Sequence, residues 1–371
     1  MIEDSPLSSR QLLYSQHSHT INTAHSFTVT SYNVLAEHAL YHDIHMYEQT
    51  PVNLRPMNAR HPLILAELLL HNSDIICLQE VSQEYYTTQL LPDLQRQGYA
   101  GVFHRRADDL GQPICYKQQR FELVQEETHA VRELARDKLY ETGVLREDDD
   151  VDAEESIMRK LQHPCLLVLA KLRCKLTGRL LTVANVHTLW GELGFPEIQV
   201  VQIALSFRKM VEYAGGADAT YICCGDFNST PFLPGYYLVK HGGLNDHMLN
   251  ICSAPDSTTA RNAEASKIMD IFAGAICHSA KVKSAYETVL GQEPRITNWA
   301  LMDWPLSPEL GIFEECLDYI WYSHGNLRSC AVLQMPERED IARHSCIPSV
   351  IFPSDHISIQ AVMQFVGLLY Y

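Results

Sequence analysis

Several short apolar segments of this chain share one feature: each favours a β-strand and leads into polar residues. The segment at 220–224 is followed by Gly-Asp-Phe-Asn-Ser-Thr-Pro at 225–231. Serine, threonine and proline interrupt the strand pattern there, so Asp226 and Asn228 are predicted to stand where a buried strand ends. Side chains two residues apart on an extended chain point the same way. The pair therefore predicts a carboxylate and an amide that project together from a sheet edge, or an Asx turn that closes the strand.

The same arrangement recurs along the chain, with amphipathic helices between the apolar segments. Strands are predicted at 27–35, 74–80, 180–187, 220–224, 317–322 and 357–359. Helices are predicted at 59–70 and 196–213, where apolar residues recur at helical spacing. The polar residues at or near the strand ends are Asn33, Glu80, Asn185, His187, Asp226, Asn228, Asp318, Asp355 and His356. Because binding sites of α/β proteins collect where strand ends meet loops, we expect these residues to converge in one cleft.

The chemistry of this set favours phosphoryl transfer over zinc binding. The set is rich in carboxylates, contains histidine and asparagine, and includes no cysteine. Oxygen ligands of this kind suit Mg²⁺ or Mn²⁺ better than zinc, and Mg²⁺ usually takes one or two protein carboxylates together with phosphate oxygens and water. The set therefore predicts a Mg²⁺ site, with Mn²⁺ as a substitute, at which water attacks a phosphate.

Composition limits the partners and the compartment. A formal net charge of −16 over 371 residues argues against binding nucleic acid through bulk charge, so such contacts must be local. The 11 cysteines show no zinc-finger spacing, which favours a reducing compartment, the cytoplasm or the nucleus. No apolar run is long enough for a membrane span, and no signal peptide is recognisable. The basic residues that could guide a strand, each interpreted as an ordinary surface charge, are Arg55, Arg60, Arg105, Arg106, Lys281 and Lys283.

Three segments lie outside this pattern. Residues 1–25 are rich in serine and histidine and are predicted to be a flexible N-terminal segment. Residues 133–163 are charged, with an acidic run at 147–150, and are interpreted as a solvated insertion. Residues 253–267 are interpreted as a loop or surface segment. No break in composition divides the remainder, so residues 26–371 are predicted to form one domain.

Six short motifs carry the polar residues. They are Ser-Tyr-Asn-Val-Leu at 31–35, Leu-Gln-Glu-Val at 78–81, Asn-Val-His at 185–187, Gly-Asp-Phe-Asn-Ser-Thr-Pro at 225–231, Leu-Asp-Tyr-Ile at 317–320 and Pro-Ser-Asp-His at 353–356. Their order resembles the endonuclease/exonuclease/phosphatase superfamily, and within it the group of carbon catabolite repressor deadenylases, nocturnin, Angel and 2′-phosphodiesterases. The resemblance implies a four-layer α/β sandwich, two packed mixed β-sheets flanked by helices, and makes residues 26–371 the catalytic domain.

The resemblance also implies catalytic roles. Asp226 would orient or deprotonate the attacking water, and Asn228 would bind the scissile phosphate. His356 would contact a phosphate oxygen and stabilise the developing charge. Asp318 would hold His356 in its tautomer and orientation, a pairing that makes physical sense by itself. His187 would be another phosphate-contacting or acid/base group.

The metal would be held by carboxylates. The resemblance makes Glu80 the principal Mg²⁺ ligand, places Asn33 beside it, and puts Asp355 near a second metal. The metal would polarise phosphate oxygens and stabilise charge in the transition state, so the protein would need no nucleophile of its own.

Substrate recognition is assigned to three further residues. Phe313 matches an aromatic residue that stacks on adenine in the deadenylases, and Trp190 matches a tryptophan that follows the histidine motif. Asn185, on the same strand face as His187, is predicted to contact substrate. Glu192 stands where the deadenylases carry a proline that sandwiches the base, which puts adenine selectivity in doubt.

Together these features predict a Mg²⁺-dependent phosphodiesterase acting on RNA, a 3′-to-5′ exoribonuclease of poly(A)-deadenylase type. One alternative is a phosphatase or phosphodiesterase that acts on 2′-phosphate or 2′,3′-cyclic phosphate ends. The other is a catalytically silent scaffold. No leucine-rich repeat precedes residue 26, so that docking module is not expected, and the sequence does not identify any protein partner.

Overall fold

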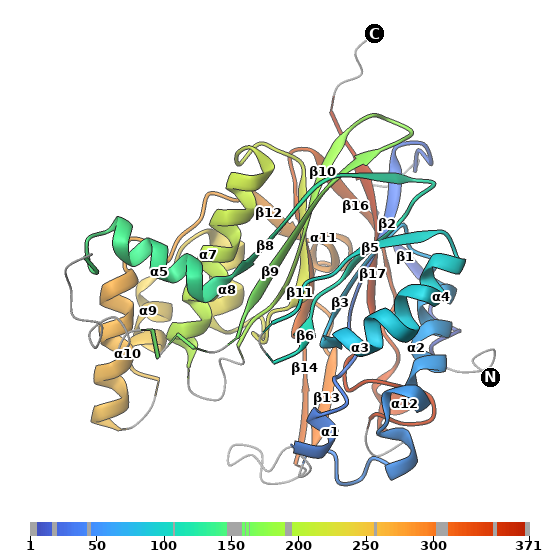
Figure 1. The fold of residues 1–371 in the computed structure, drawn as a ribbon, viewed down its shortest axis with the longest axis horizontal. Helices are drawn as coiled ribbons and strands as arrows, with labels where there is room; N and C mark the ends of the chain where they lie inside the picture. Colours follow the sequence, from blue (N-terminus) through green and yellow to red (C-terminus); the bar gives the residue numbers. More distant parts are fainter. Residues whose placement is uncertain are drawn as a thin grey trace.

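Two β-sheets pack face to face in the computed structural model of this chain, and helices cover the outer face of each sheet (Figure 1). This arrangement confirms the predicted four-layer α/β sandwich. The structure describes residues 6–16, 21–42, 46–106, 108–146, 158–159, 161–162, 164–189, 195–255, 258–301, 311–343 and 347–367.

Each sheet contains one central parallel pair of strands. Among the described residues, the larger sheet has the order β1 (Leu12–Tyr14), β16 (Leu327–Leu333), β17 (Ile359–Phe365), β2 (Ser26–Asn33), β3 (Ile75–Gln79), β7 (Ile114–Lys117) and β5 (Tyr99–Val102). The other sheet has the order β12 (Val282–Ser284), β15 (Asp318–Ser323), β11 (Tyr221–Asp226), β10 (Leu180–His187), β9 (Leu166–Cys174) and β8 (Phe121–Ala130). The parallel pairs are β2 with β3 and β10 with β11. Since parallel strands end at the same edge, each pair brings two polar strand ends together.

The central strand β3 is apolar from Ile75 to Leu78 because both of its faces are buried. In β3, Ile75 and Cys77 belong to the core between the two sheets, whereas Ile76 and Leu78 belong to the layer between sheet and helices. Successive side chains of a strand point to opposite faces, so one apolar run fills two layers.

The outer layers are helical on both sides. The larger sheet is covered by α2 (Met57–His71), which η1 (Val52–Leu54) precedes, and by α3 (Gln83–Tyr85), the π-helix η2 (Tyr86–Leu90) and α4 (Leu91–Arg96). The other sheet is covered by α5 (Val131–Glu141), α7 (Pro196–Ala214), α8 (Pro234–His241), α9 (Asp246–Ser253) and α10 (Thr259–Phe272). α11 (Ala285–Leu290) packs into the core between the sheets through Ala285 and Tyr286. Within the described parts of the chain, no helix is long and apolar enough to cross a bilayer.

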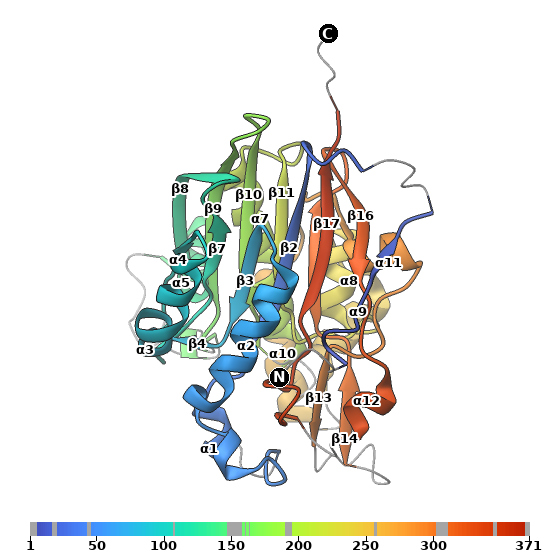
Figure 2. The ribbon, with the colours of Figure 1, turned by 90° about the vertical axis from the view of Figure 1, so that its right-hand side faces the viewer.

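Small elements gather at one end of the sandwich, drawn at the bottom of Figures 1 and 2. They are α1 (Ala39–His42), the strand pair β4 (Val81–Ser82) and β6 (Leu110–Gly111), the strand pair β13 (Asn298–Leu301) and β14 (Ile312–Glu315), and α12 (Arg338–Ala342). β2 and β3 lead into this end, since α1 and β4 follow them in the chain. The polar strand ends therefore open onto a region enclosed by these elements.

Residues 6–16 differ from the predicted flexible N-terminal segment. β1 pairs antiparallel with β16, and Leu7 is buried. The Arg10 side chain is buried too. Its Nη2 donates to the Ser358 carbonyl oxygen at 2.6 Å, and its Nη1 lies 3.5 Å from Glu67 Oε1. Composition could not reveal these contacts, because they join distant parts of the chain: Arg10 and Ser358 are 348 positions apart.

Two other segments are more ordered than predicted. The segment 133–163, interpreted as a solvated insertion, begins inside α5, which buries Val131, Ala135 and Leu139 against the helical layer. This apolar stripe at four-residue spacing is hidden in a charged composition, whereas the acidic run at 147–150 lies outside the described residues. Residues 253–267 were interpreted as a loop or surface segment, but α10 begins at Thr259 and buries Ala265.

Glu293 predicts a pH dependence of stability. Tyr236 Oη and Ser284 Oγ each donate to its carboxyl group at 2.9 Å, and burial raises its pKa from 4.5 to about 7. The folded state thus keeps a proton that the unfolded state has lost, so stability falls as pH rises from about 4.5 to about 7. Replacing Glu293 by glutamine removes this loss. When the pH rises from 5 to 8, the difference in unfolding free energy between the variant and wild type should therefore change by about 2 kcal/mol in favour of the variant.

Urea unfolding at the two pH values measures this gain. Glu212→Gln, which changes an exposed carboxylate on α7, provides the control and should show no such gain. A Glu293→Gln effect of equal size at both pH values would contradict the prediction.

Candidate active site

The polar ends of the two parallel strand pairs meet across the sandwich. In one sheet, Asn33 ends β2 and Glu80 directly follows β3. In the other sheet, His187 stands opposite Asp226 in the register of β10 and β11. Asn33 Nδ2 donates to Asp226 Oδ2 at 3.0 Å, a hydrogen bond from one sheet to the other. The predicted convergence of strand ends is therefore present in the structure.

Asn33 bridges two carboxylates. Besides Asp226, its Nδ2 donates to Glu80 Oε1 at 2.9 Å, while its Oδ1 accepts the Leu35 backbone N–H at 3.0 Å. Both ends of the amide are thereby engaged by the protein. In this geometry Asn33 positions the carboxylates, and its direct role as a metal ligand stays a prediction.

Glu80 sits in a strained turn at the end of β3. Its backbone φ is +59°, a left-handed conformation that side chains other than glycine, asparagine and aspartate rarely adopt. Its Oε2 accepts the Ala36 backbone N–H at 2.8 Å. Burial alone would raise the pKa of Glu80, but His187, the Ala36 N–H and Asn33 outweigh it and lower the pKa below its ordinary value. Glu80 therefore stays a carboxylate at neutral pH.

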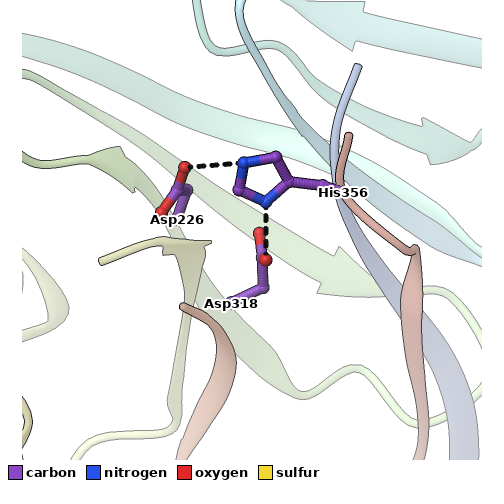
Figure 3. Close-up of side chains that lie close together, drawn as sticks. All are labelled: Asp226, Asp318 and His356. Carbon is purple, nitrogen blue, oxygen red and sulfur yellow. Dashed lines mark hydrogen bonds and ion pairs between the residues drawn. The ribbon is translucent and has the colours of Figure 1, made fainter. Parts of the chain in front are cut away.

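His356 lies between two carboxylates (Figure 3). Its Nδ1 is 2.8 Å from Asp318 Oδ2, and its Nε2 is 3.5 Å from Asp226 Oδ2. Burial alone would lower the pKa of His356, yet Asp318, Asp226 and Asp355 raise it well above its ordinary value. The imidazole is thus held as a cation, and Asp318 fixes which ring nitrogen faces the cavity.

Asp226 has the opposite balance. Burial raises its pKa, the His356 cation lowers it, and the Asp318 charge raises it again, to about 7. Its Oδ1 accepts the Asn228 backbone N–H at 2.9 Å, so the Asx turn expected from the sequence also forms. The turn and the functional pair are therefore compatible, because the turn is what aims the carboxylate.

His187 and Asn228 form a neutral pair beside Asp226. Asn228 Nδ2 lies 3.1 Å from His187 Nε2 and donates to the Thr188 carbonyl oxygen at 2.8 Å. Burial is the main cause that lowers the pKa of His187 to about 4, and the positive charge of Arg106 lowers it further. His187 is therefore an uncharged imidazole near pH 7. Its Nδ1 is buried and has no hydrogen-bond partner.

Asp355 approaches from the loop before β17. Its Oδ2 accepts a hydrogen bond from Tyr47 Oη at 2.7 Å. Burial and the nearby Glu80 charge raise its pKa, although His356 opposes the shift. Tyr47 and Asp355 both line the cavity that Glu80 and His356 also line.

Six of the predicted site residues line one open cavity of about 340 Å³: Glu80, His187, Asp226, Asn228, Asp355 and His356. Its remaining lining comes from the end region of the sandwich and from the loops after β2 and β10. The lining residues are Leu35, Ala39, Met46, Tyr47, Glu80, Arg106, Pro164, His187, Thr188, Leu189, Asp226, Asn228, Asn298, Ala300, Leu317, Asp355 and His356. A cavity of this size admits a nucleotide-sized group next to the carboxylates.

The donor set fits a metal ion. Ligand atoms of Asp226, Asp318 and His356 lie within 4.8 Å of one another, and with His356 protonated the two carboxylates are the groups of this cluster that could bind an ion. Glu80 and Asp355 line the same cavity and add two carboxylates. Asp318 Oδ1 is buried without a partner. Such a concentration of oxygen ligands, with Arg106 as the one lysine or arginine among the described lining residues, is stabilised by a cation.

Comparison with known proteins decides the family. The sequence profile described as the Endonuclease/Exonuclease/phosphatase family matches residues 30–356. The chain belongs to this family. Solved structures share the fold of this chain as well. The crystal structure of ANGEL2, a 2′,3′-cyclic phosphatase, in complex with adenosine-2′,3′-vanadate superposes with a TM-score of 0.73 at 22% identity. The superposition covers 96% of this chain and 99% of that one. The human nocturnin catalytic domain superposes with a TM-score of 0.60 at 22% identity, covering 98% and 99%.

Two curated relatives of the family share more sequence. The CCR4-Not complex 3′-5′-exoribonuclease subunit Ccr4 of Mycosarcoma maydis is 29% identical over 91% of this chain and 50% of its own length. The 2′,5′-phosphodiesterase 12 of Bos taurus is 29% identical over 89% of this chain and 50% of its own length. The chain therefore spans about half the length of the curated relatives it matches.

Asn185 differs from its predicted part in substrate binding. Its Nδ2 donates to the carbonyl oxygens of Leu78 and Pro113 at 2.8 and 2.9 Å, and its Oδ1 accepts Gln79 Nε2 at 2.8 Å. The side chain is fully buried and does not line the cavity. Asn185 thus ties β10 to the strands of the other sheet, which corrects the expectation drawn from its position two residues before His187.

The two predicted base-stacking residues stand differently. Phe313 is half-buried in β14, directly opposite Ala300 of β13. Cross-strand partners point to the same face of a sheet, and Ala300 lines the cavity. Phe313 therefore points to the same side of β13 and β14 as the cavity, next to the part that Ala300 lines. Trp190 lies outside the described residues, as does Glu192.

Sequence reasoning missed three residues that shape the site. Arg60 was interpreted as a surface charge but is buried, and Arg106 lines the cavity. Arg55 is buried as well, bonded to the carbonyl oxygens of Tyr47 and Thr50. No periodicity marks these arginines, because each reaches its partners through a long side chain from a segment of ordinary composition.

Replacing Asp318 tests the charge balance around His356. Asp318→Asn removes the negative charge 2.8 Å from Nδ1, so the pKa of His356 should fall by roughly 1 to 2 units. NMR titration of the imidazole in EDTA measures the shift. Asp93→Asn is the matched control: it removes a carboxylate that lies 2.8 Å from another imidazole, that of His61, and should leave the titration of His356 unchanged. An unchanged His356 titration in Asp318→Asn would refute the proposed balance.

Arg60 should be needed to hold the site together. Its Nη1 donates to the carbonyl oxygens of Val34 and Pro353 at 2.7 and 3.0 Å, and its Nη2 to that of Leu35 at 2.7 Å. It therefore joins the loop after Asn33 to the loop before Asp355. Arg60→Met leaves these buried carbonyls without donors and should cost about 3 kcal/mol of unfolding free energy in urea titrations. A loss below about 1 kcal/mol would contradict this assignment.

Proposed function

We propose that this chain is a Mg²⁺-dependent phosphodiesterase that hydrolyses RNA, a 3′-to-5′ exoribonuclease of poly(A)-deadenylase type. The observation that carries the proposal is the pairing of Asp226, whose pKa is raised to about 7, with the His356 cation in an open cavity that Glu80 and Asp355 also line. The name of the Mycosarcoma maydis relative, a 3′-5′-exoribonuclease subunit, supports the direction and the substrate.

In the proposed reaction, Asp226 accepts a proton from the attacking water. A pKa near neutrality suits a general base, because such a group is partly ionised and still basic enough to take the proton. Asn33 and the Asn228 backbone N–H fix the carboxylate from both sides. The water is thereby aimed at a phosphorus atom held in the cavity.

Charge that develops on the phosphate is met by His356 and Asn228. The His356 Nε2 points toward Asp226 and the cavity, while Asp318 on Nδ1 keeps the ring cationic. A phosphate oxygen can replace His187 Nε2 as the acceptor of the Asn228 amide, because that contact, at 3.1 Å, joins two neutral groups. The neutral His187, in the tautomer with its proton on Nε2, then donates a hydrogen bond to the phosphate.

Glu80 and Asp355 would hold Mg²⁺, with Asn33 and Tyr47 orienting them. When bound, the ion neutralises phosphate oxygens and stabilises the charge of the transition state. Oxygen ligands of this kind favour Mg²⁺, and Mn²⁺ can substitute.

A second candidate is the same chemistry at a 2′-linked or 2′,3′-cyclic phosphate. The Bos taurus relative is named a 2′,5′-phosphodiesterase, and the ANGEL2 neighbour is a 2′,3′-cyclic phosphatase. Glu192, in place of a base-sandwiching proline, also weakens the case for adenine selectivity. A silent scaffold is disfavoured, because no residue of the catalytic set is replaced.

A substrate panel tests the proposal. The protein is incubated with 5′-labelled oligoadenylate, 2′,5′-linked oligoadenylate and RNA ending in a 2′,3′-cyclic phosphate, each with Mg²⁺ or EDTA. Stepwise Mg²⁺-dependent shortening of the first substrate is expected. Preference for either of the others favours the second candidate, and no turnover with Mg²⁺ or Mn²⁺ favours the scaffold.

The catalytic assignment is tested in the same assay. Asp226→Asn and Glu80→Gln should each reduce kcat at least about 100-fold, because one removes the general base and the other a metal ligand. Glu212→Gln, an exposed carboxylate on α7, should cleave like wild type. Undiminished cleavage by Asp226→Asn would refute the proposed site.

A further inference from the structure

Arg106 introduces a permanent positive charge into a cavity whose other described ionisable lining residues are Tyr47, carboxylates and histidines. Its side chain is 10% exposed, whereas that of the neighbouring Arg105 is 54% exposed and pairs with Asp109 outside the cavity. Adjacent residues of an extended segment point to opposite sides, which explains the contrast. The Arg106 N–H donates to the Leu110 carbonyl oxygen at 2.6 Å and so fixes the turn that presents it.

The guanidinium is held by a partner that a ligand can replace. Nε and Nη2 donate to the two carboxylate oxygens of Asp108 at 3.0 and 2.8 Å, and Nη1 lies 3.4 Å from the Pro164 carbonyl oxygen. The Asp108 side chain is 38% exposed, so water can solvate this carboxylate once it leaves the guanidinium. A phosphate offers the same two-oxygen geometry as the carboxylate and can take its place.

Arg106 is separate from the groups assigned to the scissile phosphate. Those groups are Asn228 and His356, with His187 next to Asn228. Arg106 shares the cavity lining with them but makes its hydrogen bonds to Asp108 and Pro164. Its charge nevertheless reaches His187, whose pKa it lowers in addition to the effect of burial. Arg106 therefore lies beside the reaction centre rather than in it.

The rest of the cavity would repel a second phosphate. Glu80, Asp226 and Asp355 concentrate negative charge there, and the whole chain has a net charge of −16. A substrate with a further phosphodiester next to the scissile one needs a cation where that group lies. In the described lining, Arg106 is the lysine or arginine that can supply it.

We propose that Arg106 releases Asp108 and binds the phosphodiester next to the scissile one. The site would then select substrates that contain at least two successive phosphodiester linkages. This inference rests on the proposed function, because it assumes that the cavity takes a phosphodiester. Asp108 acts as a competitor that the substrate displaces. Arg106 is thus a specificity-determining residue that distinguishes an oligonucleotide from a compound with a single phosphate.

The test compares substrates that differ by one phosphate. Adenylyl-adenosine has one phosphodiester and the adenosine trinucleotide has two, and both end in a free 3′ hydroxyl. Arg106→Gln should raise KM for the trinucleotide roughly 10- to 100-fold, with kcat little changed, and should leave the dinucleotide within about twofold. Arg105→Gln, the adjacent arginine that points away, should change neither substrate. If the enzyme instead prefers cyclic phosphate ends, the same pair of substrates is used with cyclic phosphate termini.

Asp108→Asn gives a prediction of opposite sign. It frees Arg106 from its competitor and should lower KM for the trinucleotide, an improvement that a folding defect cannot produce. An equal loss on both substrates in Arg106→Gln would overturn the proposal, since Arg106 would then serve the scissile phosphate or the fold. An unchanged trinucleotide KM would overturn it as well.

Failure of the proposed function gives a different result. If wild type cleaves none of these substrates, equilibrium binding of the trinucleotide and the dinucleotide is measured instead. Tighter binding of the trinucleotide that Arg106→Gln abolishes would still support the phosphate subsite. Equal binding of both by wild type would overturn it.

Discussion

Asp226 is a buried carboxylate at the junction of two sheets, and the geometry of the whole site depends on how it is held. Asn33 reaches it from the opposite sheet, the Asn228 backbone N–H from its own turn, and His356 from the loop before β17. None of these contacts is an ion pair with lysine or arginine, so burial still raises the pKa of Asp226 to about 7. A carboxylate held this way is oriented while its pKa stays near neutrality, which is the condition a general base requires.

The charges around Asp226 are separated in a way that gives each group a different protonation state. His356 is held as a cation by three carboxylates, and His187, facing Arg106, is neutral. Two imidazoles within reach of one carboxylate therefore perform different tasks because their neighbours differ. If neither a bound cation nor Arg106 were present, the carboxylates of this cavity would repel a polyanion. Local charge, and not the net charge of the chain, thus governs the proposed contact with RNA.

The strands that carry the site could be predicted because their pattern is local. An apolar run that ends in Asp226 or in Glu80 can be recognised in the sequence, and so can the helix α7. Other elements were hidden for identifiable reasons. β1 and the buried Arg10 depend on partners more than half the chain away, and α5 buries a narrow apolar stripe inside a charged segment. The position of Asn185 suggested substrate contact, but whether its strand face meets solvent or the other sheet is decided by packing.

The sequence by itself determined the residues at the strand ends, which follow from periodicity, and the family, which follows from short motifs; the two-sheet sandwich was implied by the family resemblance. Only the tertiary structure decided their relations. It placed Asn33 between Glu80 and Asp226, turned Arg60 inward to join two loops, and aimed Arg106 into the cavity while Arg105 points away. The physical reason is that a strand fixes the direction of its own side chains, whereas distance, burial and pKa depend on what the rest of the chain packs against them.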